Sequence, residues 1–224
     1  MADLLHDCAL VIMAKAPCAG RVKTRLEPAV PPNALVDLYR CLIEDTVALA
    51  RQARVPRIAV VCPRGDGDDV ARWLDVEVVE QEGSGLAAGL ASVFPLLLGN
   101  GCRRVIAFNG DTPHLPPETL TGAFALLDCH DLVVGPTEDG GYYLVGATRA
   151  HAGLFDADGL GTGGALRSLL ARAAERGLGV ALSEAWYDVD EGSDLARLGA
   201  DLRRTPARAP RTAAWLAAWN GRMP

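Results

Sequence analysis

The chain has 224 residues, of which 50% are hydrophobic, and its formal net charge is -6 at pH 7. This length and composition allow one domain with a substantial buried core. The acidic balance provides no overall basic field, which argues against nucleic acid as a partner. An anionic small substrate therefore needs local cations or a metal ion.

The six cysteines are scattered and form no Cys-x-x-Cys pair, which argues against a zinc site and against a disulfide framework. The first residues carry the acids Asp3 and Asp7 and lack the basic start of a signal peptide. No apolar stretch is long enough to cross a bilayer. We therefore expect mostly free thiols and a cytoplasmic protein without a membrane partner.

The amino-terminal half alternates short apolar runs with longer segments of helical spacing. A first strand over residues 9–13 is followed by a loop and by a helix that begins at Pro31-Pro32-Asn33 and ends near Pro56. Strands are then expected over residues 58–62, 76–79 and 105–108, with helices over residues 86–98 and 116–127. Continuous apolar strands separated by helices predict an α/β fold with a mostly parallel, doubly wound sheet. Such a sheet has helices on both faces.

The carboxyl-terminal half interrupts this alternation. Residues 132–136 and 142–146 are two β-prone runs joined by an Asp-Gly-Gly turn, which predicts an antiparallel pair and hence a mixed sheet. A helix over residues 162–177 and a strand over residues 180–182 follow. Residues 203–210 have a linker composition, and the last helix carries Trp215 and Trp219. We expect a domain of residues 1–202 and a tail of residues 203–224, packed on the domain or on a second subunit of a homodimer.

A loop rich in cations follows the first strand. Its backbone amides, freed by proline and glycine geometry, can cradle phosphate oxygens. Arg25 could grip a phosphate with two hydrogen bonds, and Lys23 could act as a point charge. The spacing differs from a Walker loop, and a solvated basic loop is the alternative. The residues of this loop that we assign to nucleotide binding are Ala14, Lys15, Pro17, Gly20, Lys23 and Arg25.

Two acidic segments complement these cations. Asp111 lies where a buried strand should end, although an acid at that place can also cap the following turn. Asp188 and Asp190 lie on the same side of an extended segment late in the chain. Magnesium binds one or two protein carboxylates together with phosphate oxygens and waters, so we assign all three acids as candidate ligands. Asp194 is expected to stabilise the start of a helix instead.

Two glycine-bearing loops extend the candidate site. In the first, Gly83, Gly85 and Leu86 precede a helix, so that a nucleotide base or ribose could approach the backbone closely. The second is the turn expected to contact a small-molecule acceptor, in which Asp139 or Glu138 would orient or deprotonate a hydroxyl and Tyr142 would provide a ring platform. An ordinary Asp-Gly turn is the alternative. The residues assigned to the acceptor are Glu138, Asp139, Gly140, Gly141 and Tyr142.

The four histidines show no metal-binding spacing, and no Ser/His/Asp arrangement is visible. Only His114 lies near a candidate site residue, Asp111. We expect a surface position or a supporting role for it.

Several of these motifs, in this order, resemble a known family. They are Met13-Ala14-Lys15-Ala16-Pro17, Val22-Lys23-Thr24-Arg25-Leu26, Gly110-Asp111-Thr112-Pro113, Asp139-Gly140-Gly141-Tyr142 and Asp188-Val189-Asp190. From about residue 9 to residue 198, the chain is similar to bacterial GT-A-fold, glycosyltransferase-like proteins of the type connected with arsenosugar biosynthesis. Phospholactate and molybdenum-cofactor guanylyltransferases are related to them. The resemblance implies a nucleoside triphosphate or nucleotide-sugar bound with Mg²⁺ or Mn²⁺ across the strand ends.

Two segments depart from that pattern. Residues 83–90 resemble the corresponding loop of the guanylyltransferases more than the Gly-Asp-Leu-Gly pattern that is usual in the family. Gly161-Thr162-Gly163 matches only part of the tryptophan-bearing turn that is usual in the family. Thr162 could instead cap a helix.

Three functions follow from these residues. In glycosyl transfer, a metal on Asp111 with Asp188 or Asp190 neutralises the leaving diphosphate, and Asp139 positions the acceptor. In nucleotidyl transfer, Lys23 and Arg25 hold a triphosphate. The third is a nucleotide-binding module without catalysis, since fold alone does not prove activity. We favour the glycosyltransferase and assign Asp139, Lys23 and Arg25 the catalytic roles.

Overall fold

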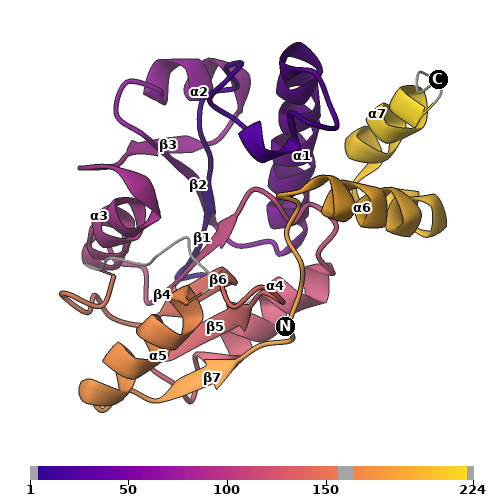
Figure 1. Cartoon of the computed structure of the whole chain (residues 1–224). Helices are drawn as coiled ribbons and strands as arrows, with labels where there is room; N and C mark the ends of the chain where they lie inside the picture. The colour runs from indigo at the N-terminus through magenta and orange to yellow at the C-terminus, as the bar shows by residue number, and fades with distance from the viewer. Residues whose placement is uncertain (1–4, 156–163, 221–224) are drawn as a thin grey trace.

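The computed structural model describes residues 5–155 and 164–220, and a single sheet runs through this part of the chain (Figure 1). Its strand order is β3-β2-β1-β4-β6-β5-β7. β6 runs antiparallel to β4 and β5, whereas the pairs β1 with β2, β1 with β4, β2 with β3 and β5 with β7 are parallel. The strands are β1 (Cys8–Met13), β2 (Arg57–Cys62), β3 (Glu77–Glu80), β4 (Arg104–Asn109), β5 (Leu132–Pro136), β6 (Tyr142–Ala147) and β7 (Val180–Leu182). The predicted mixed, mostly parallel sheet is confirmed.

Helices cover both faces of this sheet, as expected. They are α1 (Pro32–Gln52), α2 (Gly67–Trp73), α3 (Gly85–Gly99), α4 (Pro117–Leu126), α5 (Ala165–Glu175), α6 (Gly192–Arg204) and α7 (Pro210–Asn220), with short 3-10 helices η1 (Thr24–Leu26) and η2 (Pro206–Arg208). In Figure 1, α3 and α5 lie on one side of the sheet, and α1 and α4 lie on the other. None of the helices in the described ranges is both long and apolar enough to span a membrane.

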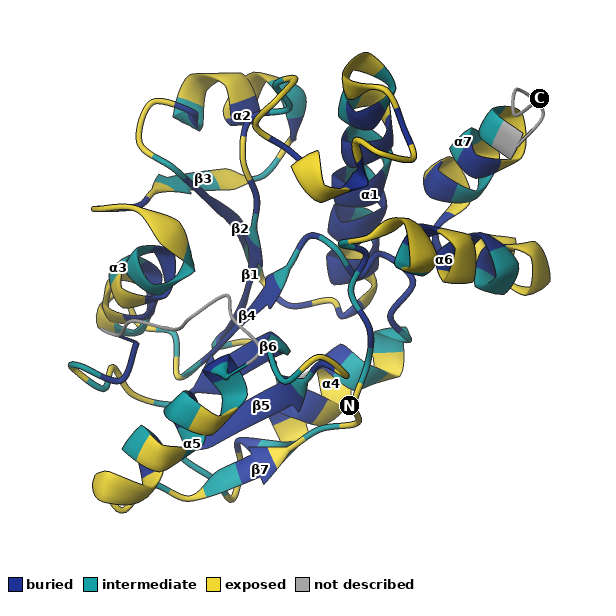
Figure 2. Ribbon diagram, viewed as in Figure 1, coloured by how far each residue is buried: buried dark blue, intermediate teal, exposed yellow. Residues whose placement is uncertain are grey.

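The strands separate two apolar layers because successive side chains point to opposite faces. In β1, Leu10 and Ile12 pack with α1 and α4, and Ala9 and Val11 pack with α3 and α5. Figure 2 shows the central strands as almost continuously buried. Burial on both faces explains why their sequences lack the polar alternation of an exposed sheet.

A third apolar cluster lies between α1, α6 and α7. Leu38 and Leu42 of α1 pack there with Leu198 of α6 and Leu216 of α7. The buried carboxylate of Asp45 also accepts hydrogen bonds from the first turn of α7. The last helix therefore packs on α1, and the proposed division at residue 202 stays a prediction.

The structure differs from the sequence predictions in three segments. α2 was not expected, because its seven residues contain only one buried apolar position, Val70. The expected linker at residues 203–210 contains the end of α6 and η2, and Ala209 within it is fully buried. α5 begins at Ala165 and ends at Glu175, and Gly177 follows in the left-handed conformation (φ 65°), as expected for a helix stop. The predicted motif at residues 161–163 lies outside the described residues.

All six cysteines are free, whereas the sequence predicted that most of them would be.

Candidate functional site

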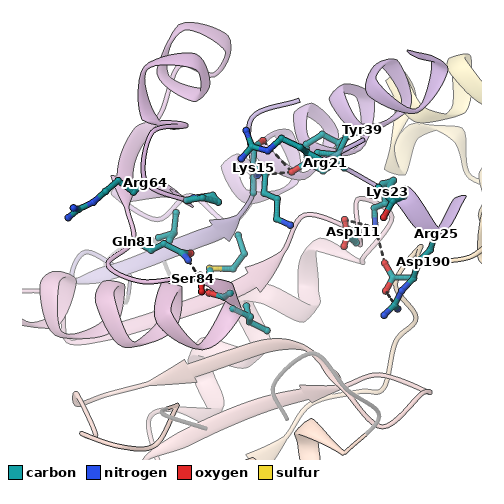
Figure 3. Close-up of a pocket in the computed structure, with 18 of the residues that line it drawn as sticks. Lys15, Arg21, Lys23, Arg25, Tyr39, Arg64, Gln81, Ser84, Asp111 and Asp190 are labelled. Carbon is teal, nitrogen blue, oxygen red and sulfur yellow. Dashed lines mark hydrogen bonds and ion pairs between the residues drawn. The ribbon is translucent and has the colours of Figure 1, made fainter. Parts of the chain in front are cut away.

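A cavity of about 830 Å³ opens at the carboxyl ends of β1, β2 and β4 (Figure 3). Ligands of α/β proteins commonly bind at this edge of the sheet, because the loops after parallel strands meet there. The predicted site residues that line the cavity are Ala14, Lys15, Lys23, Arg25, Gly83, Gly85, Leu86, Asp111 and Asp190. The structure therefore brings the basic loop, the first glycine loop and two of the three candidate metal ligands to one place.

The basic loop is held from outside by two residues that the sequence analysis missed. The backbone N–H of Lys15 donates to the hydroxyl of Tyr39 (2.8 Å), and that of Ala16 donates to the buried carboxylate of Asp66 (2.8 Å). Arg21 also donates to Asp66 (3.0 Å), and this hydrogen bond raises the pKa of Arg21. Tyr39 comes from α1 and Asp66 from the loop after β2, so no local pattern could link them to this loop. Pro17 and Gly20 belong to the loop but do not line the cavity.

Lys23 is the most constrained cation of the site. Its backbone has a left-handed conformation (φ 50°), and its side chain is 5% exposed. Its Nζ lies 2.8 Å from Asp111 Oδ1 and 3.1 Å from Asp190 Oδ1, and donates to the carbonyl of Val189 (2.6 Å). Burial lowers the pKa of Lys23, but the two carboxylates raise it overall. Lys23 is therefore charged and lies between the two acids.

Two of the three candidate metal ligands, Asp111 and Asp190, contact this lysine, and the charges of both act on the third, Asp188. The backbone N–H of Val189 donates to the carbonyl of Asp111 (3.2 Å), which joins the two acidic segments. Burial, together with the nearby charges of Asp190, Asp111 and Asp139, raises the pKa of Asp188 to about 6. Arg25 pairs with Asp190 at 3.3 Å from an exposed position. The carboxylates thus outnumber the cations that contact them.

A divalent ion fits the chemistry of this donor set, because Mg²⁺ and Mn²⁺ prefer carboxylate oxygens and would offset the excess negative charge. Within the described ranges, however, no three Asp, Glu, His or Cys side chains are grouped in a way that could hold a metal by themselves. Lys23 lies between Asp111 and Asp190 instead. The metal roles of Asp111, Asp188 and Asp190 stay predictions.

The glycine loop before α3 owes its shape to Gln81, which the sequence analysis also missed. This side chain is 5% exposed, and its amide group donates to the carbonyls of Gly83 (3.2 Å) and Gly85 (3.1 Å). Both glycines have a left-handed backbone, with φ of 86° and 82°, which other residues adopt only at a cost. A polar residue directly after β3 was the only available signal in the sequence.

The turn between β5 and β6 lies outside this cavity. Asp139 accepts hydrogen bonds from the hydroxyl of Thr137 (2.5 Å) and the backbone N–H of Gly141 (3.1 Å). The hydroxyl contact lowers the pKa of Asp139. The carbonyl of Gly140 accepts from Leu166 at the start of α5 (3.1 Å). Asp139 therefore stays ionised, which suits orienting a hydroxyl better than removing its proton.

The neighbours of Asp139 point elsewhere. Glu138 makes two hydrogen bonds to Arg197, of 2.7 and 2.9 Å. Tyr142 packs against the apolar layer under α3 and α5, and its buried hydroxyl has no partner among the described residues. The acceptor roles of Glu138 and Tyr142 stay predictions, and neither residue lines the main cavity.

Two further expectations concern residues beside the acids. His114 is 1% exposed, and its Nε2 accepts a hydrogen bond from the indole N–H of Trp186 (2.9 Å). The prediction of a surface position for His114 was therefore wrong, because its buried ring packs against the rings of Trp186 and Tyr187. Asp194 accepts from the backbone N–H of Glu191 (2.8 Å) in a capping box at the start of α6, which is the structural role we expected.

Comparison with known sequences places the chain in a family. Residues 46–162, more than half of the 224, match the sequence profile of the family described as "Uncharacterized protein conserved in bacteria (DUF2064)". The chain belongs to DUF2064. The matched part of this DUF2064 protein contains Asp111 and the turn with Asp139, whereas Lys23 and Asp190 lie outside it. None of the curated protein sequences matches the chain significantly.

Solved structures support the fold. A protein of Desulfovibrio desulfuricans G20, described as a candidate nucleotide-diphospho-sugar transferase, has a TM-score of 0.88 and 24% identity, with 96% of each chain covered. A nucleotidyl transferase of Methanothermobacter thermautotrophicus has a TM-score of 0.61 and 20% identity, with 88% of this chain and 98% of the other covered. Rv0371c of Mycobacterium tuberculosis H37Rv, in complex with manganese, has a TM-score of 0.52 and 21% identity, with 86% and 97% covered. At these identities the DUF2064 chain is shown to share their fold.

Proposed function

We propose that this DUF2064 protein is a metal-dependent transferase that uses a nucleotide-linked donor, and that the donor is a nucleotide-sugar. One observation carries the proposal: the basic loop, the glycine loop and two acids from distant segments line a single cavity of about 830 Å³. That volume lies within the usual range for small-molecule and cofactor sites, roughly 300 to 1,000 Å³. The structural neighbours include a nucleotide-sugar type and a nucleotidyl type of transferase.

The cations of the cavity would take different parts in binding the donor. No ion pair joins Lys15 to an acid of the described residues, and Figure 3 draws its side chain extending into the cavity. Lys15 is thus available for the phosphates of a donor. Lys23 neutralises Asp111 and Asp190, and the exposed Arg25 pairs with Asp190. We therefore assign the first phosphate contact to Lys15 and charge balance to Lys23.

Asp111 and Asp190 would hold the metal ion, with Asp188 beside them. The excess of carboxylates around Lys23 and the pKa of about 6 for Asp188 support a further cation at this place. A bound Mg²⁺ or Mn²⁺ supplies positive charge that stabilises the leaving phosphate oxygens. The neighbour bound to manganese is consistent with this choice of ions.

Nucleotidyl transfer is the second candidate function. The likeness to a nucleotidyl transferase and the resemblance of the loop at residues 83–90 to guanylyltransferases favour it. In that reaction Lys15 and Lys23 would face a triphosphate, and an acceptor phosphate would attack in line. The acceptor, including the arsenosugar type that the sequence resemblance suggests, and a homodimer stay predictions.

A ligand screen followed by product analysis tests this proposal. A nucleotide that binds only the folded protein raises its melting temperature, so we expect a rise with nucleotides or nucleotide-sugars when Mg²⁺ or Mn²⁺ is present. If no nucleotide raises the melting temperature with either metal, the proposal is wrong. Release of nucleoside diphosphate from a nucleotide-sugar then identifies glycosyl transfer, and release of pyrophosphate from a nucleoside triphosphate identifies nucleotidyl transfer.

A further inference from the structure

A second cavity, of about 580 Å³, lies beside α6. The turn between β5 and β6, the segment that precedes Asp188, α6 and η2 form its walls. None of its lining residues is shared with the main cavity. It is therefore a separate feature of the described molecule that the proposed donor site does not use.

Its walls carry more positive than negative charge, although the chain as a whole is acidic. Three arginines line the cavity together with two acids, Glu138 and Asp201. Glu138 pairs with Arg197, and Asp201 pairs with Arg204 at 2.6 Å. No acid of the described residues forms an ion pair with Arg208, the third arginine. One guanidinium group is thus left to bind an anion, and guanidinium groups suit carboxylates and phosphates.

Aromatic side chains contact two of the charged groups of this cavity. The guanidinium of Arg197 lies 3.8 Å from the centre of the Tyr187 ring, and the hydroxyl of Tyr187 donates to Asp201 (2.6 Å). The ring of Trp186 lies nearly parallel to that of Tyr187, with the centres 6.2 Å apart. These contacts hold Arg197 and Asp201 in place before any ligand binds, which reduces the entropy lost on binding.

Two chain segments separate the second cavity from the acids of the donor site. Glu138 lines the second cavity, whereas the charge of the next residue, Asp139, acts on Asp188. Tyr187 lines the second cavity, and the charges of Asp190 and Asp111 raise the pKa of the next residue, Asp188. In each of the two segments, one residue therefore lines the second cavity and the next one lies near the acids of the donor site. Glu138, which lines the second cavity, directly precedes Asp139, the residue expected to orient the acceptor.

We propose that the second cavity binds the anionic group, a phosphate or a carboxylate, of the acceptor molecule. This inference rests on the proposed function, because it assigns the cavity to the second substrate of the same reaction. Arg208 supplies the free charge, and Trp186 with Tyr187 contacts the rest of the molecule. The acceptor is thus an anionic small molecule rather than a neutral sugar or alcohol.

Titration with inorganic phosphate, followed by tryptophan fluorescence at constant ionic strength, tests the anion site without donor or turnover. We expect a saturable change that Trp186→Phe abolishes, because the other three tryptophans do not line this cavity. Arg208→Gln should weaken phosphate binding at least tenfold. Arg203→Gln, a change in the last turn of α6 outside both cavities, should leave phosphate binding unchanged. Equal phosphate affinity of the Arg208 and Arg203 variants, or a signal that survives in Trp186→Phe, overturns the inference.

A second arm uses GDP and UDP, each with Mn²⁺. An acceptor site must be occupied together with the donor, so the phosphate signal should persist when a nucleotide is bound. Loss of that signal on nucleotide binding overturns the assignment to the acceptor. If neither these nucleotides nor any other donor binds, the proposed function fails, while the phosphate titration still decides whether the anion site exists.

Discussion

Lys23 and Asp190 lie 167 positions apart in the chain, and an ion pair of 3.1 Å joins them beside the main cavity. The same ammonium group lies 2.8 Å from Asp111. One buried lysine thus connects the basic loop after β1 with the acid after β4 and the acid before α6. Its positive charge lies between two carboxylates that we propose as ligands of a metal ion.

Replacing this lysine should strengthen the binding of a metal ion alone. In Lys23→Met the acids lose a positive charge that competes with the metal, and at short range such a charge is worth on the order of a few kcal/mol. We expect Mn²⁺ to bind at least roughly tenfold more tightly without nucleotide, where tenfold corresponds to about 1.4 kcal/mol. Calorimetric titration measures this. Lys15→Met is the matched control, because Lys15 lines the same cavity and no acid within residues 5–155 and 164–220 forms an ion pair with it. Unchanged or weaker Mn²⁺ binding by Lys23→Met contradicts the prediction.

Replacing Asp111 should instead weaken the binding of the nucleotide together with its metal ion. Asp111→Asn removes one carboxylate ligand and should weaken Mg²⁺-dependent nucleotide binding by roughly a hundredfold, about 2.7 kcal/mol. The side chain is 27% exposed and lies outside the apolar core, so the protein should remain folded. Titration with nucleotide in the presence and absence of Mg²⁺ separates the two effects. Asp37→Asn, an exposed change on α1, is the control; wild-type affinity in Asp111→Asn would exclude the metal role.

The attachment of α7 to α1 should depend on a single buried acid. Asp45 is 1% exposed and accepts hydrogen bonds from the backbone N–H and the hydroxyl of Thr212, each of 2.8 Å. Asp45→Ala leaves these buried donors unpaired and should lower the free energy of unfolding by about 1–3 kcal/mol. Urea unfolding measures the change, with Asp37→Ala as the control on the exposed face of the same helix. A loss no greater than that of the control would show that α7 is held by apolar contacts alone.

The stability of the protein should fall in mild acid because of His114. Burial lowers the pKa of His114 to about 4, whereas the same side chain in the unfolded chain has its ordinary value of 6.5. The unfolded state therefore binds a proton between these values and the folded state does not, so stability is complete above pH 6.5 and is lost as the pH falls toward 4. The loss is on the order of 3 kcal/mol.

The variant His114→Gln isolates this contribution. It keeps an amide near Trp186 but cannot gain the proton. Its free energy of unfolding relative to that of the wild type should therefore increase as the pH falls from 7 to 4.5. Urea unfolding of both proteins at the two pH values gives the difference. Parallel pH profiles would exclude His114 as the source.

The strands and most helices were predictable because their patterns are local. The apolar run at residues 9–13 became β1 (Cys8–Met13), and the Asp-Gly-Gly turn correctly indicated the antiparallel pair of β5 and β6. α2 was missed because a short helix with one buried residue leaves little periodic signal. The buried Ala209 was missed because a composition rich in Arg and Pro says nothing of what packs against it.

The candidate site was only partly predictable. Lys23, Asp111 and Asp190 could be selected from residue type and position after strands, and the structure brings them together. Tyr39, Asp66 and Gln81 could not, because each acts through a hydrogen bond to the backbone of a loop. Such contacts depend on the distance between segments and leave no motif.

The sequence by itself determined the α/β class, the order of the strands along the chain and the charged loops at their ends, because these follow from periodicity and residue chemistry at neighbouring positions. Only the tertiary structure decided that Lys23 lies between two acids, that Glu138 pairs with Arg197 while Asp139 accepts a hydrogen bond from Thr137, and that Arg208 lines a second cavity. Each of these depends on which distant segments meet and on the direction of individual side chains. Packing sets both, and no local pattern in the sequence records them.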